Sequence, residues 1–179
     1  ALPTPTWRKL YGGVQPTKST NVQVTDTTGM LEAYAEIDKA LADLNGNSAA
    51  FRMTEDKAHI EGMSQEFAAT LMYGNEGSAP EEFTGFAPRF NDNSGPANAD
   101  NIILGGGSGS DNSSIWLISW GANTVHGIYP KGSKAGLQFN DKGQVTIEDS
   151  DGSNGGRYEA YRSHYRWDCG LSVRDWRYV

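Results

Sequence analysis

Residues 6–37 read TWRKLYGGVQPTKSTNVQVTDTTGMLEAYAEI, and this pattern predicts a long two-stranded hairpin. A strand signal at 7–11 and another at 22–28 flank a polar connection through Pro16 and Lys18, which we expect to form the tip. Strands of about 15 residues at ~3.3 Å per residue reach roughly 50 Å, whereas a compact domain of 179 residues is about 40 Å wide. A lone two-stranded ribbon is marginal in water. We therefore expect the hairpin to overhang its own domain and to rest on a neighbouring molecule.

A short helix is predicted immediately after the hairpin. Residues 29–44 fit a helical stripe and an alternating strand equally well, and we place a strand to about Ile37. Asp38 would then be the N-cap of a short helix that ends at Asn45-Gly46, because Asp favours the position before a helix and Gly the position after it.

The clearest helix is predicted at residues 54–73. Thr54 is a suitable N-cap, two acids follow it in the first turn, and Gly74 stops the pattern. The apolar stripe that would face a core comprises Ile60, Met63, Phe67 and Leu71. Gly62 costs about 1 kcal/mol relative to alanine inside a helix, so we expect another segment to pack closely against it.

The second half of the chain predicts antiparallel strands. A turn-rich stretch at 74–114 is anchored by three phenylalanines, Phe83, Phe86 and Phe90. Strand patterns return at 115–120, 124–129, 144–148 and 157–179. Tight turns are predicted at Asp141-Lys142-Gly143 and Asp151-Gly152. One parity of the last strand is apolar (Tyr161, Tyr165, Trp167, Cys169, Leu171, Val173) and the other polar (Arg162, His164, Arg166, Asp168, Arg174), so we expect it to be half buried.

The composition indicates a globular protein. Hydrophobic residues make up 37% of the chain and charged residues 21%. The formal charge of −7, from 15 Lys and Arg against 22 Asp and Glu, argues against a dedicated nucleic-acid binder. The longest apolar stretch is far below the ~20 residues that a membrane helix needs. Cys169 is the single cysteine, so no disulfide can form within one chain.

No metal site is predicted. The histidines and the cysteine share no ligand spacing: His59, His126, His164 and Cys169. Residues 149–153 resemble the start of a calcium loop, but Asn154 and Ala160 stand where such a loop needs Gly and Glu. A hairpin turn is the better interpretation.

The sequence also predicts no cofactor and no catalytic centre. The glycines at 105–110 and the segment at 132–134 precede no helix pattern, whereas a phosphate-binding loop opens a helix. There is no nucleophile-elbow motif, and Cys169 falls on the apolar parity of its strand, where thiols are usually inert. We therefore expect a protein that is not an enzyme.

Two other functions remain open at this point. Arginines interleaved with aromatic residues at 157–179 are compatible with binding of sugars or single-stranded nucleic acid. A carbohydrate-binding or tail-fibre-like β module of a virion is therefore the first alternative. An enzyme is the second, and it would need a pocket that joins His164 or His126 to carboxylates.

Several long segments resemble the major capsid proteins of short-tailed bacteriophages. They are residues 7–14, 28–44, 51–75, 80–85, 120–132 and 168–178, which together span nearly the whole chain. The resemblance implies an α+β protein with the coat-protein fold shared by tailed phages and herpesviruses. That fold has an extended hairpin loop, a peripheral domain with a long spine helix and an antiparallel sheet, and an axial domain.

The resemblance also implies a domain organisation. Residues 1–5 would be the end of the N-terminal arm, 6–37 the extended hairpin loop and 38–179 the peripheral domain. The peripheral domain would contain the spine helix at 54–73, a surface insertion at 91–114 and antiparallel strands at 115–179. Members of this family are considerably longer, and both ends read as interior sequence, so we expect a piece of a longer chain that lacks most of the axial domain.

The function that the resemblance implies is assembly of a capsid. Copies would associate as hexamers and pentamers of an icosahedral head around double-stranded DNA, in the virion, after assembly in the host cytoplasm. The expected inter-subunit contacts join Trp7, Arg8, Lys9, Leu10, Tyr11 and Lys18 of the loop to Glu55, Asp56 and Glu61 of a neighbour. Scaffolding, portal and decoration proteins are further expected partners. Packaged DNA should bind weakly because the chain is acidic, and no membrane contact is expected.

Overall fold

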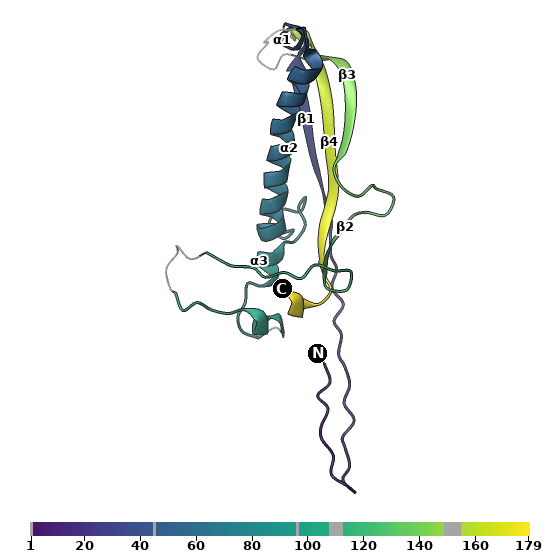
Figure 1. The fold of residues 1–179 in the computed structure, drawn as a ribbon, viewed down its shortest axis with the longest axis vertical. Coiled ribbons are helices and arrows are strands. Elements are labelled where there is room, and N and C mark those ends of the chain that lie inside the picture. The colour runs from purple at the N-terminus through teal and green to yellow at the C-terminus, as the bar shows by residue number, and fades with distance from the viewer. Residues whose placement is uncertain (1, 45, 96, 108–112, 149–154) are drawn as a thin grey trace.

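The computed structural model describes residues 2–44, 46–95, 97–107, 113–148 and 155–179. The chain is an α+β protein in which a long helix covers one face of an antiparallel sheet (Figure 1). The molecule is elongated, and its N-terminal residues extend beyond the end of the sheet as a loop with two legs (Figure 1). Among the described residues, no helix has both the length and the apolar character of a membrane span.

The sheet is organised around one long central strand, β4 (Arg157–Val173). Strand β1 (Thr28–Asp38) pairs with one side of it. Strands β3 (Gln138–Glu148) and β2 (Val125–Ile128) follow one another along the other side. All three pairings are antiparallel, so every other strand of the sheet depends on β4.

The two faces of the sheet differ in chemistry, as the alternation of β4 predicts. Ala33 and Tyr165 are opposite each other in the register, and both pack in the core beneath the helix. One step along, Glu32 is opposite Arg166, and these side chains lie on the other face, where they form an ion pair. The prediction of a half-buried ribbon is confirmed.

Two helices follow β1. Helix α1 (Lys39–Asp43) is capped by Asp38, whose carboxylate accepts a hydrogen bond from the Ala40 N–H at 2.8 Å, as predicted. Helix α2 (Ser48–Tyr73) ends at Gly74 as predicted but begins six residues earlier than expected. Its N-cap is Asn47, which accepts from the Ala50 N–H at 3.2 Å.

Thr54 is therefore not the N-cap. It lies inside α2, where its hydroxyl donates to the Ala50 carbonyl oxygen at 3.1 Å. This bond to the preceding turn is the alternative use of a threonine side chain within a helix. Thr54 has the chemistry of a capping residue but lies inside the helix, so the predicted start of α2 was too late.

The core lies where α2 and the following turn meet the sheet. Its main cluster comprises Phe83, Phe86, Val125, Cys169 and Leu171, and Phe86 and Leu171 are fully buried. Phe86 is the first residue of helix α3 (Phe86–Arg89). The expectation that phenylalanines anchor this turn-rich stretch is confirmed. Phe67 of α2 stacks on Trp167 of β4, with ring centroids 4.4 Å apart.

The strand predictions in the second half need correction. Residues 115–120 form no strand among the described residues beyond an isolated bridge from Trp120 to Val125. The predicted turn at 141–143 is a bulge inside β3, where the register shifts between Asp141 and Gly143. Short 3-10 helices lie at η1 (Ala97–Asn101) and η2 (Trp176–Tyr178), so the last strand ends earlier than expected. The predicted turn at 151–152 and the calcium-like stretch at 149–153 lie outside the described residues.

Candidate interaction surfaces

We call residues 2–25 the arm and residues 26–179 the body. Every side chain of the arm is exposed. Its two legs run away from the body beyond the end of the sheet (Figure 1). The legs are extended, but they form no strand. The strand predicted at 7–11 is therefore absent, and of the strand predicted at 22–28 only Thr28, the first residue of β1, is in a strand. A strand-like sequence is thus present without a partner strand among the described residues.

The tip of the arm is apolar. The chain turns at Lys9–Gly12, where the Gly12 N–H donates to the Lys9 carbonyl oxygen at 3.1 Å. The predicted polar tip around Pro16 and Lys18 is therefore wrong. Trp7, Leu10 and Tyr11 surround the turn and are 104%, 86% and 107% exposed. Tyr11 has a φ of 62°, an uncommon conformation for a residue other than glycine.

The arm has a charge opposite to that of the chain as a whole. It carries three basic residues, Arg8, Lys9 and Lys18, and no acid, whereas the chain has a net charge of −7. None of the three forms an ion pair with a described residue. The arm therefore offers three basic groups and an apolar tip to solvent.

A network of hydrogen bonds fixes the root of the arm to the body. Arg89 of α3 binds the Asp26 carboxylate at 2.8 Å, and the Ser172 hydroxyl of β4 donates to the same carboxylate at 2.8 Å. Arg89 also donates to the backbone oxygens of Thr84 and Leu171. Both members of the ion pair are largely buried, with side chains 16% and 15% exposed. The arm therefore leaves the body from a fixed point.

Sequence reasoning missed this root clamp. Asp26 is the first acidic residue of the chain, at the boundary between the basic arm and β1. That position is the one feature of the sequence that could have indicated a role for Asp26. The partners of Asp26, Arg89 and Ser172, are 63 and 146 residues away in the chain. Nothing in the local pattern connects such distant residues.

The three acids expected to receive the arm divide into two groups. Glu55 and Glu61 of α2 are exposed. Asp56 is only 9% exposed, and its carboxylate accepts a hydrogen bond from the Ser163 hydroxyl at 3.1 Å. Burial, and to a smaller extent the nearby Asp56 carboxylate, raises the pKa of the Tyr165 hydroxyl to about 12. Asp56 therefore acts within its own subunit, and the expected role at a surface is left to Glu55 and Glu61.

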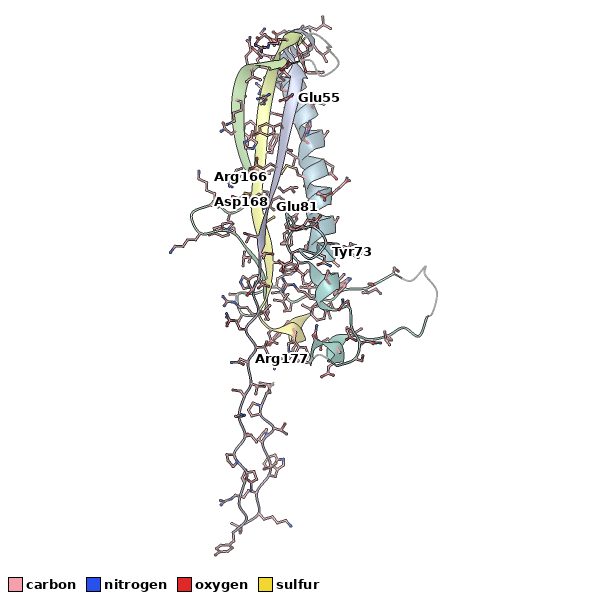
Figure 2. The ribbon with its side chains drawn as sticks, turned by 180° about the vertical axis from the view of Figure 1, so that it is seen from behind. Glu55, Tyr73, Glu81, Arg166, Asp168 and Arg177 are labelled. Atoms are coloured by element: carbon pink, nitrogen blue, oxygen red, sulfur yellow. The ribbon has the colours of Figure 1, made fainter. Side chains whose placement is uncertain are left out.

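The outer face of the sheet carries charges that are already paired. Glu32 contacts His164 at 3.0 Å and Arg166 at 3.5 Å, and Glu36 contacts Arg162 at 2.6 Å. Arg166 also binds Asp168 at 2.9 Å; this bond and one from the Ser133 hydroxyl lower the pKa of Asp168. Figure 2 shows Arg166 and Asp168 on this side of the molecule.

The candidate metal and catalytic residues are not brought together. Within the described ranges, no three His, Cys, Asp or Glu side chains are placed to hold a metal ion. His164 stacks on Tyr34, with ring centroids 4.5 Å apart, whereas Cys169 lies in the core on the other face. Burial raises the pKa of the Cys169 thiol to about 11, which keeps it protonated and unreactive at neutral pH.

The interleaved aromatic residues of β4 serve the body. Tyr165 is 4% exposed, and one face of Trp167 is covered by Phe67. Flat exposed rings are what a sugar or base needs for stacking, so these two residues offer no such platform. The fully exposed aromatic residues lie at the tip of the arm instead.

Comparison with known proteins was made on sequence and on structure. A protein-family model described as "Major capsid protein GP7" matches residues 1–179. The structure is similar to a chain in the validated near-atomic resolution structure of bacteriophage epsilon15 derived from cryo-EM and modelling, with 45% sequence identity and a TM-score of 0.60. The match covers 99% of this chain and 53% of that chain, so this chain spans about half the length of the similar one. A search of the curated proteins found no match.

Proposed function

The chain belongs to the major capsid protein GP7 family, and from this we propose that it is a coat subunit that assembles with copies of itself into the head of a bacteriophage. The copies form the hexamers and pentamers of an icosahedral shell that encloses double-stranded DNA. In this proposal the function is structural and resides in contacts between subunits, with no catalytic step.

The observation that carries the proposal is the projection of the arm. Its side chains are all exposed, and it extends beyond the body (Figure 1). Burial of a large apolar side chain is worth about 1.5–3 kcal/mol, and the arm leaves Trp7, Leu10 and Tyr11 without any such burial. A second copy that covers these residues supplies the missing stabilisation, and the root clamp at Asp26 aims the arm toward it.

The parts of the molecule take the roles of the tailed-phage coat fold in this proposal. The arm corresponds to the extended loop, α2 to the spine helix and the sheet to the peripheral domain. The long helix, the antiparallel sheet and the similarity to a chain of the bacteriophage epsilon15 structure support this assignment.

Charge supports the same contact. Arg8, Lys9 and Lys18 of one subunit would approach Glu55 and Glu61 of the next. Each exposed pair contributes less than about 1 kcal/mol, so the pairs select orientation more than they hold the shell together. Many identical contacts repeated over a closed shell make the assembly cooperative.

Other partners follow from the same proposal. Scaffolding, portal and decoration proteins would contact the assembled shell. Packaged DNA would bind only weakly, because the chain carries a net charge of −7 and repels phosphate. Tight binding of duplex DNA by purified subunits at physiological salt would contradict this part.

The test compares two triple variants of the complete natural polypeptide. Trp7→Ala/Leu10→Ala/Tyr11→Ala removes the apolar tip of the arm. Sedimentation and negative-stain microscopy should show loss of shells, hexamers and pentamers, while the thermal unfolding midpoint of the subunit stays within about 2 °C.

The matched control removes a similar exposed apolar area from the body. Ile103, Ile115 and Leu117 are 94%, 100% and 89% exposed, and their replacement by alanine should leave assembly intact. Equal loss of assembly in both variants would remove the special role of the arm. A native protein that stays monomeric and binds glycans would overturn the proposed function and favour a carbohydrate-binding module.

A further inference from the structure

An apolar hollow lies between α2 and the edge strand β1. It has a volume of about 370 Å³. It is lined by Leu31 and Ala33 of β1 and by Ala58, His59, Gly62, Met63 and Glu66 of α2. The small side chains at 33, 58 and 62 leave the space, and Met63, which is 5% exposed, belongs to the core beneath. The hollow is therefore a recess in the packing of helix on sheet, with Met63 of the core at its base and an exposed helix surface along its side.

Gly62 is not explained by anything inside the described chain. A glycine within a helix costs about 1 kcal/mol relative to alanine, and the usual compensation is close approach of another segment. A Cβ built on Gly62 meets no described atom within 4 Å. No described residue therefore makes the close contact expected at this position, and the helix surface there is open to another group.

The helix surface around Gly62 is acidic. Glu55, His59, Gly62 and Glu66 follow each other at spacings of four, three and four residues, which places them along one side of α2. Glu61 is also exposed, but it lies about 100° from Gly62 around the helix axis and so stands outside this row. A segment that enters the hollow therefore meets the Glu66 carboxylate in the lining, and the Glu55 carboxylate lies on the same side of the helix.

The arm has the complementary chemistry. Its tip combines the exposed apolar groups of Trp7 and Leu10 with the basic side chains of Arg8 and Lys9, and the whole arm contains no acid. The subunit's own arm does not reach the hollow. Figure 2 shows Glu55 near one end of α2. The arm leaves the body at the opposite end and points away from the helix.

We propose that the hollow beside Gly62 receives the tip of the arm, residues 7–11, of a second copy of this chain. The indole of Trp7 fills the recess over Gly62, while Arg8 and Lys9 face Glu55 and Glu66. The inference rests on the proposed function, because it assigns the place on the neighbour where the arm of a coat subunit binds.

Cysteine cross-linking in assembled shells tests the placement. In the complete natural polypeptide, Gly62→Cys is combined in turn with Arg8→Cys, Lys9→Cys or Leu10→Cys. The native Cys169 is 8% exposed and its thiol stays protonated at neutral pH, so it gives little background. Mild oxidation should produce a ladder of covalently linked chains on a denaturing gel from at least one of the three pairs.

The control places the helix cysteine elsewhere. Ser64 is exposed and lies about 200° from Gly62 around the helix axis, at 3.6 residues per turn. Ser64→Cys with the same arm cysteines should cross-link at least tenfold less. Intact shells without the ladder, equal cross-linking from position 64, or a link within one chain would each overturn the inference. Failure of the native protein to form shells would overturn the proposed function instead.

A charge exchange gives a second readout that does not alter the hollow. Arg8→Glu/Lys9→Glu should slow assembly several-fold, and adding Glu55→Lys/Glu66→Lys should restore it. The same exchange at Glu81, which is exposed, and Glu82, which is half-buried, both on the turn after α2, should not restore it. Rescue by both pairs, or by neither, would contradict the placement of the arm beside Gly62.

Discussion

Trp7 in the arm and Phe86 in the body are both large aromatic residues, yet the first is 104% exposed and the second 0%. The same contrast holds for charge. Arg89 is paired with Asp26, and Arg162 and Arg166 of β4 are paired as well, whereas Arg8 has no ion-pair partner among the described residues. Phe86 and Arg89 find their partners within the chain, whereas Trp7 and Arg8 face solvent. Under the proposed function, folding depends on the body and assembly on the arm.

The largest expected effect comes from exchanging these two aromatic residues for alanine. Phe86→Ala should lower the free energy of unfolding by about 3–5 kcal/mol, because it opens a cavity in the main core cluster. Trp7→Ala should change it by less than about 0.5 kcal/mol, because the side chain is fully exposed in the described part of the chain. Chemical denaturation of the disassembled subunit measures both. A large loss of stability in the arm variant would mean that the arm folds onto the body in solution.

Cys169 of the body should react with a thiol reagent about a hundredfold more slowly than a cysteine placed in the arm. Burial raises the pKa of Cys169 from its ordinary value of 9.0 to about 11, so at pH 8 the folded chain holds about 100 times less thiolate at this position. A cysteine at position 11 of the arm should react with iodoacetamide as a free thiol does. Mass spectrometry of labelled native and denatured protein gives both rates.

The same pKa fixes the pH range in which Cys169 matters for stability. Because the folded state holds its proton more tightly, the contribution is complete below about pH 9 and is lost as the pH rises toward 11. Cys169→Ser should therefore remove the part of the alkaline loss of stability that lies in this range. An unchanged alkaline profile in that variant would show that other groups cause it.

The sequence predicted elements whose cause is local. Asp38 caps α1, Gly74 ends α2 and the parity of β4 separates the two sheet faces, and each of these is set by neighbouring residues. The start of α2 was misplaced because Thr54 has the chemistry of an N-cap but sits inside the helix. Capping preference alone does not choose between Thr54 and Asn47.

Features that depend on a distant partner were not predictable. The arm and residues 115–120 have strand-like patterns, but a strand needs a second strand, and none of the described chain supplies one there. The contact residues expected from the sequence, Trp7, Leu10, Tyr11 and the acids of α2, stay a prediction. The burial of Asp56 and the root clamp depend on contacts more than 60 residues apart in the chain.

The clamp at the root of the arm should have the next largest effect. Asp26→Ala leaves the largely buried Arg89 without its carboxylate and Ser172 without its acceptor, which should cost about 2–3 kcal/mol of unfolding free energy. Glu36→Ala breaks the more exposed pair with Arg162 and should cost less than about 1 kcal/mol. Chemical denaturation compares the two. Equal costs would show that the clamp is an ordinary surface ion pair.

The smallest expected effect has the opposite sign and contrasts two glycines. Gly62→Ala should raise the free energy of unfolding by about 1 kcal/mol, because alanine favours the helix and its Cβ meets no described atom within 4 Å. A Cβ added at Gly170 would instead lie 2.5 Å from the Thr27 carbonyl oxygen, so Gly170→Ala should destabilise the sheet where β1 begins. If Gly62→Ala stabilises the subunit but slows assembly, the glycine serves the contact between chains. If it stabilises the subunit and leaves assembly unchanged, the hollow is larger than the arm requires. Larger side chains at position 62 then measure the volume that stays unfilled.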